Sequence, residues 1–328
     1  MKLKRLLTAI VTTLSLAAVA SSTAFAQTRW DLPSGYSPNT FQVQNLQWFA
    51  EEVTRATNGQ LRITLHPGAS LFRVPEIKRA VQTNQVPIGE FIISGAANEN
   101  PLFGLDSIPF LATTYAEARR LNDISNPHLE RLLARQGMKL LYTVPWPGQS
   151  LYSRTPLRSL ADLRGTRMRA FSPATTRVAD LVGAQPVTIQ LADLPHALAT
   201  GVVDNFLTSS VSGVDSRLYE HVRYFYEINA WLPRNAVVVN LRAFNALSAP
   251  VQAELVRVAR EAGERGWRLS EQRNEEALRE LTAKGMNVDR ASEGLRRELR
   301  QIGERMTNEW LQAAGQDGRA IIEAFHRR

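Results

Sequence analysis

Three arginines stand within one short apolar stretch, residues 163–171, which reads LRGTRMRAF. If its second part forms a strand, alternate side chains share a face, so Arg167, Arg169 and Phe171 point the same way. Arg164 precedes that strand and is expected in solvent. A guanidinium can bind a carboxylate through two parallel hydrogen bonds. Because ligands of α/β proteins bind beyond the carboxyl ends of strands, Arg169 is a better candidate anion-binding residue than Arg167.

Aromatic and amide side chains follow the ends of several other segments that resemble strands, where a ligand could meet them. Trp146 and Gln149 occur in VPWPGQ, and Gln190 ends VTIQ. The candidate ligand-binding residues are Arg169, Gln149, Trp146, Phe171, Gln190, Thr208, Asn205 and Phe206. For Trp146 and Phe171 an alternative role, packing in the core or at a hinge, stays open.

The sequence holds none of the common catalytic motifs. GxSxG, HExxH, P-loop and GxGxxG patterns are all missing. The five histidines form no i, i+4 pair, and the lack of cysteine removes cysteine-based zinc and iron–sulfur sites. We therefore expect a binding protein with no catalytic residue, metal site or cofactor. An exported hydrolase or lyase is the alternative, which turnover of a bound acid would support.

The N-terminus resembles a secretory signal peptide. The basic start MKLKR precedes an apolar run of 15 residues, and AFA at residues 24–26 forms a small-x-small cleavage site. We expect residues 1–26 to be removed and the mature chain to be periplasmic. A membrane anchor is the alternative, but a spanning helix needs ~20 apolar residues.

The net charge does not indicate a nucleic-acid partner. Its formal value of +8 falls to +5 when the three cations of the signal peptide are lost. Charges of both signs are interleaved at helical spacing, as in EAGERGWRLSEQRNEEALREL, which is typical of solvated helix faces. We expect no nucleic-acid binding and a monomer, with a modest positive field that could draw in an anion.

Strand-like and helix-like segments alternate along most of the chain, which predicts an α/β fold with largely parallel sheets. Two helices are predicted at residues 113–123 and 127–137. Beyond Pro250 a helical pattern continues to about Lys284. A helix of about 30 residues would extend ~45 Å, enough to lie along more than one domain.

Several motifs together resemble a known family. DLRGTRMR is followed by VGAQPV and by DLPHALATGVVDN, and the stretches FAEEVTRATNGQLRITLHPGASL and SIPFLATTYAEARRL precede them. In this order they resemble the solute-binding proteins of tripartite ATP-independent periplasmic (TRAP) transporters, the DctP-type family. The resemblance covers almost all of the chain after the signal peptide.

The resemblance implies a two-lobed periplasmic binding protein fold (type II-like), with a ligand cleft between the lobes and a long helix spanning both. The expected division is residues 27–146 plus about 235–274 for lobe I, and residues 147–234 plus about 275–328 for lobe II. It also implies that Arg169 is the carboxylate-binding arginine, while Arg167 takes the place of a lysine.

The sequence departs from the family pattern at positions that affect the ligand. Many members carry a second arginine near Gln149, an aspartate where this chain has Pro87, and a glycine where it has Asn205. One arginine with several aromatic residues predicts a monocarboxylate with an apolar or aromatic body. A 2-oxo or 2-hydroxy acid is favoured, because Gln149, Gln190 and Thr208 could hydrogen-bond an oxygen on carbon 2.

The implied function is capture of an organic acid anion in the cleft and its delivery to the membrane subunits of a TRAP transporter. Two alternatives keep the same two-lobed architecture. One is a periplasmic sensing protein that passes its signal to a sensor kinase. The other is a binding protein of an ATP-driven importer, which these motifs fit less well.

Overall fold

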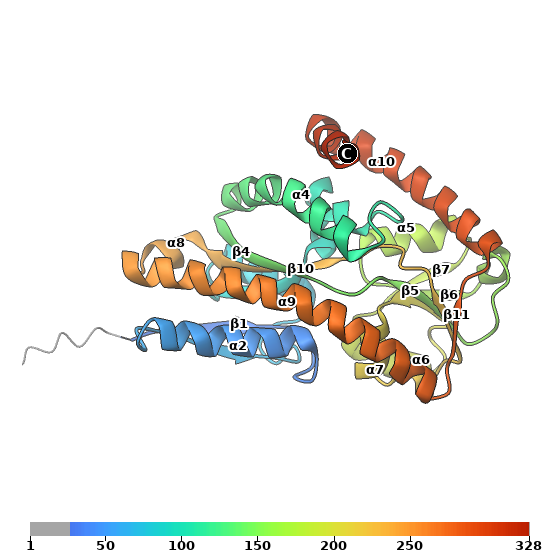
Figure 1. Cartoon of the computed structure of the whole chain (residues 1–328), viewed down its shortest axis with the longest axis horizontal. Coiled ribbons are helices and arrows are strands. Elements are labelled where there is room, and N and C mark those ends of the chain that lie inside the picture. The colour runs from blue at the N-terminus through green and yellow to red at the C-terminus, as the bar shows by residue number, and fades with distance from the viewer. Residues whose placement is uncertain (1–26, 328) are drawn as a thin grey trace, which may run out of the picture.

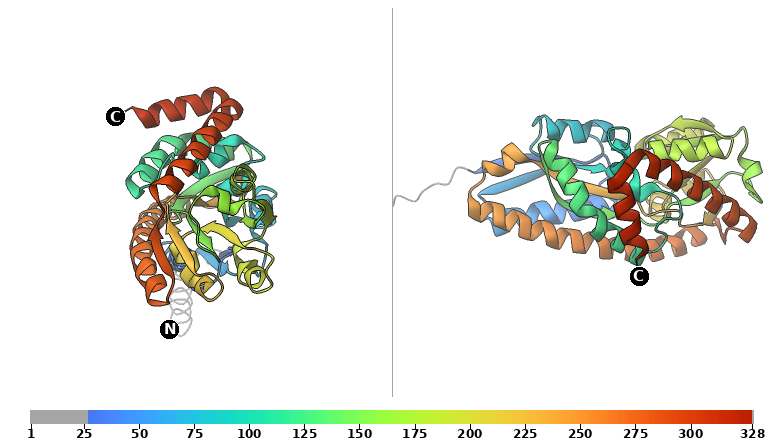
Figure 2. Two further views of the ribbon diagram at one scale, coloured as in Figure 1. Left: turned by 90° about the vertical axis from the view of Figure 1, so that its right-hand side faces the viewer. Right: turned by 90° about the horizontal axis from the view of Figure 1, so that it is seen from above.

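The computed structural model describes residues 27–327. It has the expected α/β fold of two lobes (Figure 1) and is elongated in the direction that joins them (Figure 2). The predicted signal peptide, residues 1–26, lies outside the described residues. No helix within the described range is both long enough and apolar enough to span a bilayer.

Lobe I is built on two small sheets. In its three-stranded sheet the central strand is buried along its whole length, as its run of valines predicts for a strand covered on both faces. The strands of this sheet, in order, are β3 (Ile88–Ile92), β10 (Arg234–Asn240) and β4 (Met138–Pro145). The second sheet pairs β1 (Thr28–Pro33) with β2 (Leu61–His66). The surrounding helices are α2 (Phe41–Ala56), α3 (Val74–Gln82), α4 (Tyr115–Arg135) and α8 (Leu241–Asn245), with 3₁₀ segments η1 (Ile93–Ala96) and η2 (Pro101–Ser107).

Lobe II is built on one six-stranded sheet. Its strands, in order, are β11 (Asn287–Arg290), β9 (Tyr224–Glu227), β5 (Ser150–Ser153), β8 (Asn205–Thr208), β6 (Arg167–Ala170) and β7 (Gln185–Thr188). The helical segments are α5 (Pro173–Leu181), α6 (Leu194–Ala199), α7 (Ser210–Asp215), η3 (Leu160–Leu163), η4 (Leu191–Asp193) and η5 (Leu218–Glu220).

The expectation of largely parallel sheets was wrong, because both larger sheets contain antiparallel pairs. β10 is antiparallel to both of its neighbours, and β5 is antiparallel to both β8 and β9. The reason is that β5 and β10 each follow a crossover between the lobes, from β4 to β5 and from β9 to β10. A strand that enters from the other lobe runs antiparallel to neighbouring strands that belong to βα units.

The two crossover segments lie side by side between the lobes. Trp146 N donates to Pro233 O at 2.7 Å, and Gln149 N donates to Trp231 O at 2.8 Å. Ala230 N returns a hydrogen bond to the Gln149 carbonyl at 2.8 Å. Two candidate ligand-binding residues, Trp146 and Gln149, therefore stand on a crossover segment.

Two long helices connect the lobes. As expected, α9 (Ala249–Ala283) packs on α2 and β4 in lobe I and on α7 and β11 in lobe II, and it runs along the molecule in Figure 1. The last helix, α10 (Glu293–His326), turns at Gly315, whose φ of 62° interrupts it. Its final part packs on η2 and α4 of lobe I. That packing departs from the expected division, which placed all of residues 275–328 in lobe II.

The two helices expected on either side of residue 126 form a single helix, α4. Thr114 and Glu117 make a capping box at its start, so the helix has a firm N-terminus. Pro127 removes one backbone N–H inside the helix. Buried residues on both sides of it, including Leu121 and Leu129, continue one apolar face, and this tertiary packing keeps the helix intact.

Candidate ligand-binding site

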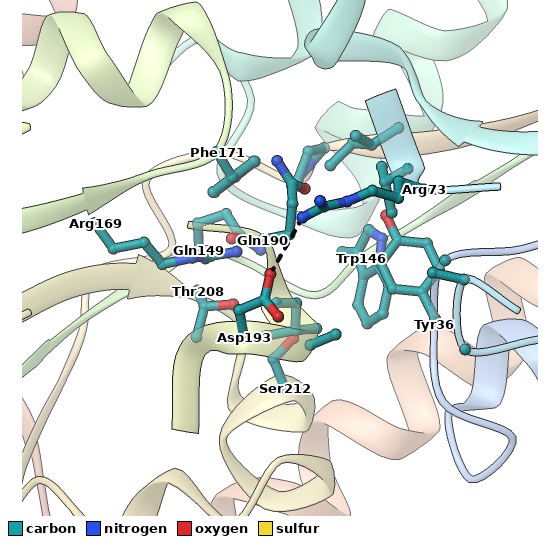
Figure 3. Close-up of a pocket in the computed structure, with 18 residues that line it drawn as sticks. Tyr36, Arg73, Trp146, Gln149, Arg169, Phe171, Gln190, Asp193, Thr208 and Ser212 are labelled. Atoms are coloured by element: carbon teal, nitrogen blue, oxygen red, sulfur yellow. Dashed lines mark ion pairs between the residues drawn. The ribbon is translucent and has the colours of Figure 1, made fainter. Parts of the chain in front are cut away.

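A cavity of about 400 Å³ lies between the lobes, within the size range of small-ligand sites (Figure 3). It is lined by Gly35, Tyr36, Gly68, Ala69, Arg73, Val74, Ile92, Trp146, Gln149, Arg169, Phe171, Gln190, Leu191, Ala192, Asp193, Thr208, Ser212 and Pro233. Six of the eight candidate residues are in this set: Arg169, Gln149, Trp146, Phe171, Gln190 and Thr208. The structure therefore brings together side chains that are far apart in the sequence.

Arg169 is a buried cation on β6. Its side chain is only 3% exposed, and Nε donates to the Ile189 carbonyl at 2.8 Å. The guanidinium carbon lies 4.8 Å from the centre of the Phe171 ring. No Asp or Glu side chain among residues 27–327 lies within ion-pair distance of it. Burial lowers the pKa of Arg169 to about 10, so the group is still charged at neutral pH.

A buried charge without a counter-ion is costly, so this arrangement favours an anion beside Arg169. The other two arginines of the same stretch are differently placed. Arg167 forms an ion pair with Asp204 at 2.8 Å near the surface, and Arg164 is exposed. Neither lines the cavity.

Trp146 and Tyr36 form an aromatic wall opposite Arg169 (Figure 3). Their rings meet edge to face at 5.0 Å, and Trp146 also packs on Phe41 at 5.5 Å. Trp146 Nε1 donates to Asn235 Oδ1 at 3.0 Å, and the Tyr36 hydroxyl donates to the same oxygen at 3.4 Å. Because Asn235 takes these polar hydrogens, the wall offers mainly apolar ring surface to the cavity.

Neutral polar groups complete the site. Gln149 is buried, and its Nε2 donates to Pro147 O at 3.0 Å, which leaves its side-chain oxygen as an acceptor. Gln190 is half-buried in front of η4, and Thr208 is buried at the end of β8. Ser212, on α7, was not foreseen. These groups can hydrogen-bond polar atoms of a ligand without adding a second charge.

Two charged residues at the cavity were missed by the sequence reasoning. Arg73, in front of α3 of lobe I, meets Asp193, at the end of η4 of lobe II, with 3.8 Å between Nη2 and Oδ2 (Figure 3). Their side chains are 71% and 60% exposed. No local spacing predicts this pair, because the approach of the two lobes brings it together. Tyr36 was missed for a similar reason, since it follows a strand that was not predicted.

The structure corrects the placement of Asn205 and Phe206, which lie outside the cavity. Phe206 is fully buried and stacks on Tyr152 with 4.8 Å between ring centres. Asn205 is buried beside Ser153 in the strand pairing. The cleft lies at the carboxyl end of β8, where Thr208 stands, and Phe206 is about 7 Å back along the strand.

The sequence matches a family over most of its length. Residues 34–313 match the family of bacterial extracellular solute-binding proteins, family 7, of the DctP type. The chain belongs to this family. It is therefore a solute-binding protein of the TRAP type and not an enzyme, and such proteins bind organic acids and work with membrane components.

Solved structures resemble this solute-binding protein closely. It is 44% identical to DctP6, a Bordetella pertussis extracytoplasmic solute receptor that binds pyroglutamic acid, with a TM-score of 0.91 over 92% of this chain and 100% of the other. It is 39% identical to a marine metagenome TRAP solute-binding protein specific for pyroglutamate, with a TM-score of 0.90 over 92% and 99% of the two chains.

A more distant relative of this solute-binding protein has a different ligand. The 2,3-diketo-L-gulonate-binding periplasmic protein of Escherichia coli is 27% identical over 256 residues, 76% of each chain. One family therefore serves both a sugar acid and a cyclic amide acid. The ligand of this chain must be argued from its own cavity.

Proposed function

We propose that this protein binds pyroglutamate, or a cyclic monocarboxylate of similar size and polarity, in the cavity between its lobes. The observation that carries the proposal is Arg169, a buried cation with no acidic partner among residues 27–327. One unpaired positive charge calls for one negative charge on the ligand. The similarity to two pyroglutamate-binding proteins supports the choice of ligand.

The rest of the cavity suits a small ring with an amide. The carboxylate would pair with the Arg169 guanidinium, and the ring would pack against Trp146 and Tyr36. The lactam N–H and C=O would then hydrogen-bond neutral polar groups such as Gln149 and Gln190. This ligand keeps the monocarboxylate expected from the sequence but replaces the 2-oxo or 2-hydroxy acid with a cyclic amide.

The proposed cycle is capture, closure and delivery. The ligand enters between open lobes, and they close about the two crossover segments by a hinge motion. Closure excludes water from the ion pair, so the pairing must be nearly complete. The closed protein then presents its ligand to TRAP membrane subunits. In this proposal the protein works as a periplasmic monomer after loss of residues 1–26, with no cofactor and no metal.

A ligand panel tests the proposal. Thermal shift should show the largest stabilisation with pyroglutamate, because a ligand that binds only the folded state raises its melting temperature. Cyclopentanecarboxylate, which lacks the amide, should stabilise the protein less. If a C4-dicarboxylate, a sugar acid or a 2-oxo acid stabilised it more than pyroglutamate, the proposed ligand would be wrong.

The ligand that the protein retains during purification gives an independent answer. Mass spectrometry of small molecules released by denaturation should detect pyroglutamate. Detection of another acid in stoichiometric amount would replace it as the ligand.

A further inference from the structure

A buried carboxyl group lies behind the aromatic wall, outside the cavity. Glu90, on β3 of lobe I, is 2% exposed. Its two oxygens accept hydrogen bonds from Ser34 Oγ at 2.6 Å and from Asn235 Nδ2 at 2.9 Å. No Lys, Arg or His side chain in the described part of the chain is within ion-pair distance of it. Burial raises the pKa of Glu90 above its usual value.

The surroundings of Glu90 make burial of a carboxyl group energetically unfavourable at this position. The neighbours of Glu90 on β3 are buried, and Ile88 and Phe91 are apolar. An apolar residue in the same place would leave no charged or partly charged group to desolvate. A carboxyl group that is buried at this cost and makes two good hydrogen bonds suggests that Glu90 has a role other than packing.

The hydrogen bonds that link Glu90 to Trp146 through Asn235 can form in only one orientation of the Asn235 amide. Trp146 Nε1 is a donor and cannot accept, so the amide of Asn235 must turn Oδ1 toward it. Nδ2 of Asn235 must then face the other way, where only an acceptor can meet it. Glu90 supplies that acceptor. Asn235 and Glu90 lie on the same face of the sheet, because Asn235 pairs with Ile92, which is two residues from Glu90 on β3.

We propose that Glu90 is a positioning residue for ligand binding, which fixes the amide of Asn235 and through it the orientation of Trp146 and Tyr36. This inference rests on the proposed function, because a preorganised aromatic wall matters only if a ligand packs against it. Without the acceptor, Nδ2 of Asn235 has no partner and the amide is held only by the donors on its oxygen side, so its orientation is less firmly fixed. A rotated amide would point N–H groups at the indole N–H, and the indole would lose its hydrogen bond to Asn235.

Two variants of Glu90 separate positioning from simple structural support. Glu90→Gln keeps a side-chain oxygen that can accept from Asn235, while Glu90→Met keeps the length and removes the acceptor. The first readout is the indole ¹H–¹⁵N resonance of Trp146 in the ligand-free protein, assigned by its loss in Trp146→Phe. The second is the dissociation constant for pyroglutamate, measured beside the melting temperature of the ligand-free protein.

We expect Glu90→Met to shift or broaden the Trp146 resonance and to weaken binding about tenfold or more, since a fixed wall no longer meets the ligand. Its melting temperature should change little, because the gain from removing a buried carboxyl is opposed by the cost of leaving Ser34 Oγ and Asn235 Nδ2 without an acceptor. Glu90→Gln should keep the resonance, with binding within about threefold of the wild type.

Two results would overturn the inference. One is an unchanged Trp146 resonance and unchanged affinity in Glu90→Met. The other is a parallel fall of affinity and melting temperature in both variants with the resonance in place, which would mean structural support alone. If Glu90→Met does not fold, Glu90→Leu removes the same acceptor and leaves Asn235 in place, and the same resonance must move. The resonance is measured without ligand, so failure of pyroglutamate to bind the wild type would reject the proposed function alone.

Discussion

At the scale of single residues, the site is organised around one energetically unfavourable feature, the buried charge of Arg169. Arg169 is buried, with one side-chain hydrogen bond, to Ile189 O, and no acidic partner in the described chain. Such a group destabilises the empty fold and is compensated when an anion arrives. Stability and function therefore oppose each other at this position.

Replacing Arg169 by Met should leave the ligand-free protein as stable as the wild type or more stable. The variant loses one hydrogen bond but also the desolvated charge. Burial lowers the pKa of Arg169 to about 10, below its usual value, so the charge and its cost are fully present at lower pH. The stability gain of the variant should hold at neutral pH and shrink as pH rises through about 10. Chemical denaturation at several pH values measures it, and a large loss of stability at pH 7 would contradict it.

The sequence distinguished Arg169 from its neighbours because chain position and the family pattern agreed. It could not distinguish Phe206 from Phe171, since both are aromatic residues near strand ends. Which of them lines the cavity depends on where the cleft lies relative to the ends of the strands. Tyr36, Arg73 and Asp193 were missed because each reaches the site from a segment with no local signal.

At the scale of elements, helices were predicted better than sheets. The helical periodicity of α2, α5 and α9 is a property of each segment alone. The direction of β5 and β10 depends on the crossovers between lobes, which no single segment records. The strands β1, β5 and β9 were not predicted, and the last two contribute to the largest sheet. α4 was predicted in two pieces because its proline is tolerated only through packing.

The contact between α9 and β4 gives a prediction at this scale. A Cβ atom at Gly266 would overlap the side chain of Val144 and press on Asn45. We expect Gly266→Ala to destabilise the protein by about 1–3 kcal/mol despite its higher helix propensity, because the helix would be pushed off the sheet. Gly294→Ala, at an open position on α10, is the control and should be nearly neutral. A Gly266→Ala variant as stable as the control would show that the helix can shift freely.

At the scale of the whole molecule, the proposed function requires two lobes that meet around a ligand. The two crossover segments are hydrogen-bonded to each other, while α9 packs on both lobes. Across the cavity, Arg73 and Asp193 form an exposed ion pair. An exposed pair contributes at most about 1 kcal/mol, so it can bias closure but cannot hold the lobes shut.

Arg73→Ala should therefore speed ligand release by up to about fivefold, with little change in the association rate. Raised salt should reduce the difference between variant and wild type, because exposed charges are screened. Arg79→Ala is the matched control, since Arg79 is exposed on α3, the helix that Arg73 precedes, and does not line the cavity. Stopped-flow kinetics with pyroglutamate measures both rates. Equal release from Arg73→Ala and Arg79→Ala would exclude a role in closure.

The central claim is that Arg169 holds the carboxylate of a small cyclic acid, and calorimetry tests it most directly. Pyroglutamate should bind the wild-type protein with one site, and Arg164→Ala should bind it equally well. Arg169→Ala should lose about 3–5 kcal/mol, a fall of 10²-fold or more in affinity, while remaining folded. Arg169→Lys should also bind poorly, because it keeps the charge but not the planar fork. Normal binding of pyroglutamate by folded Arg169→Ala would contradict the account.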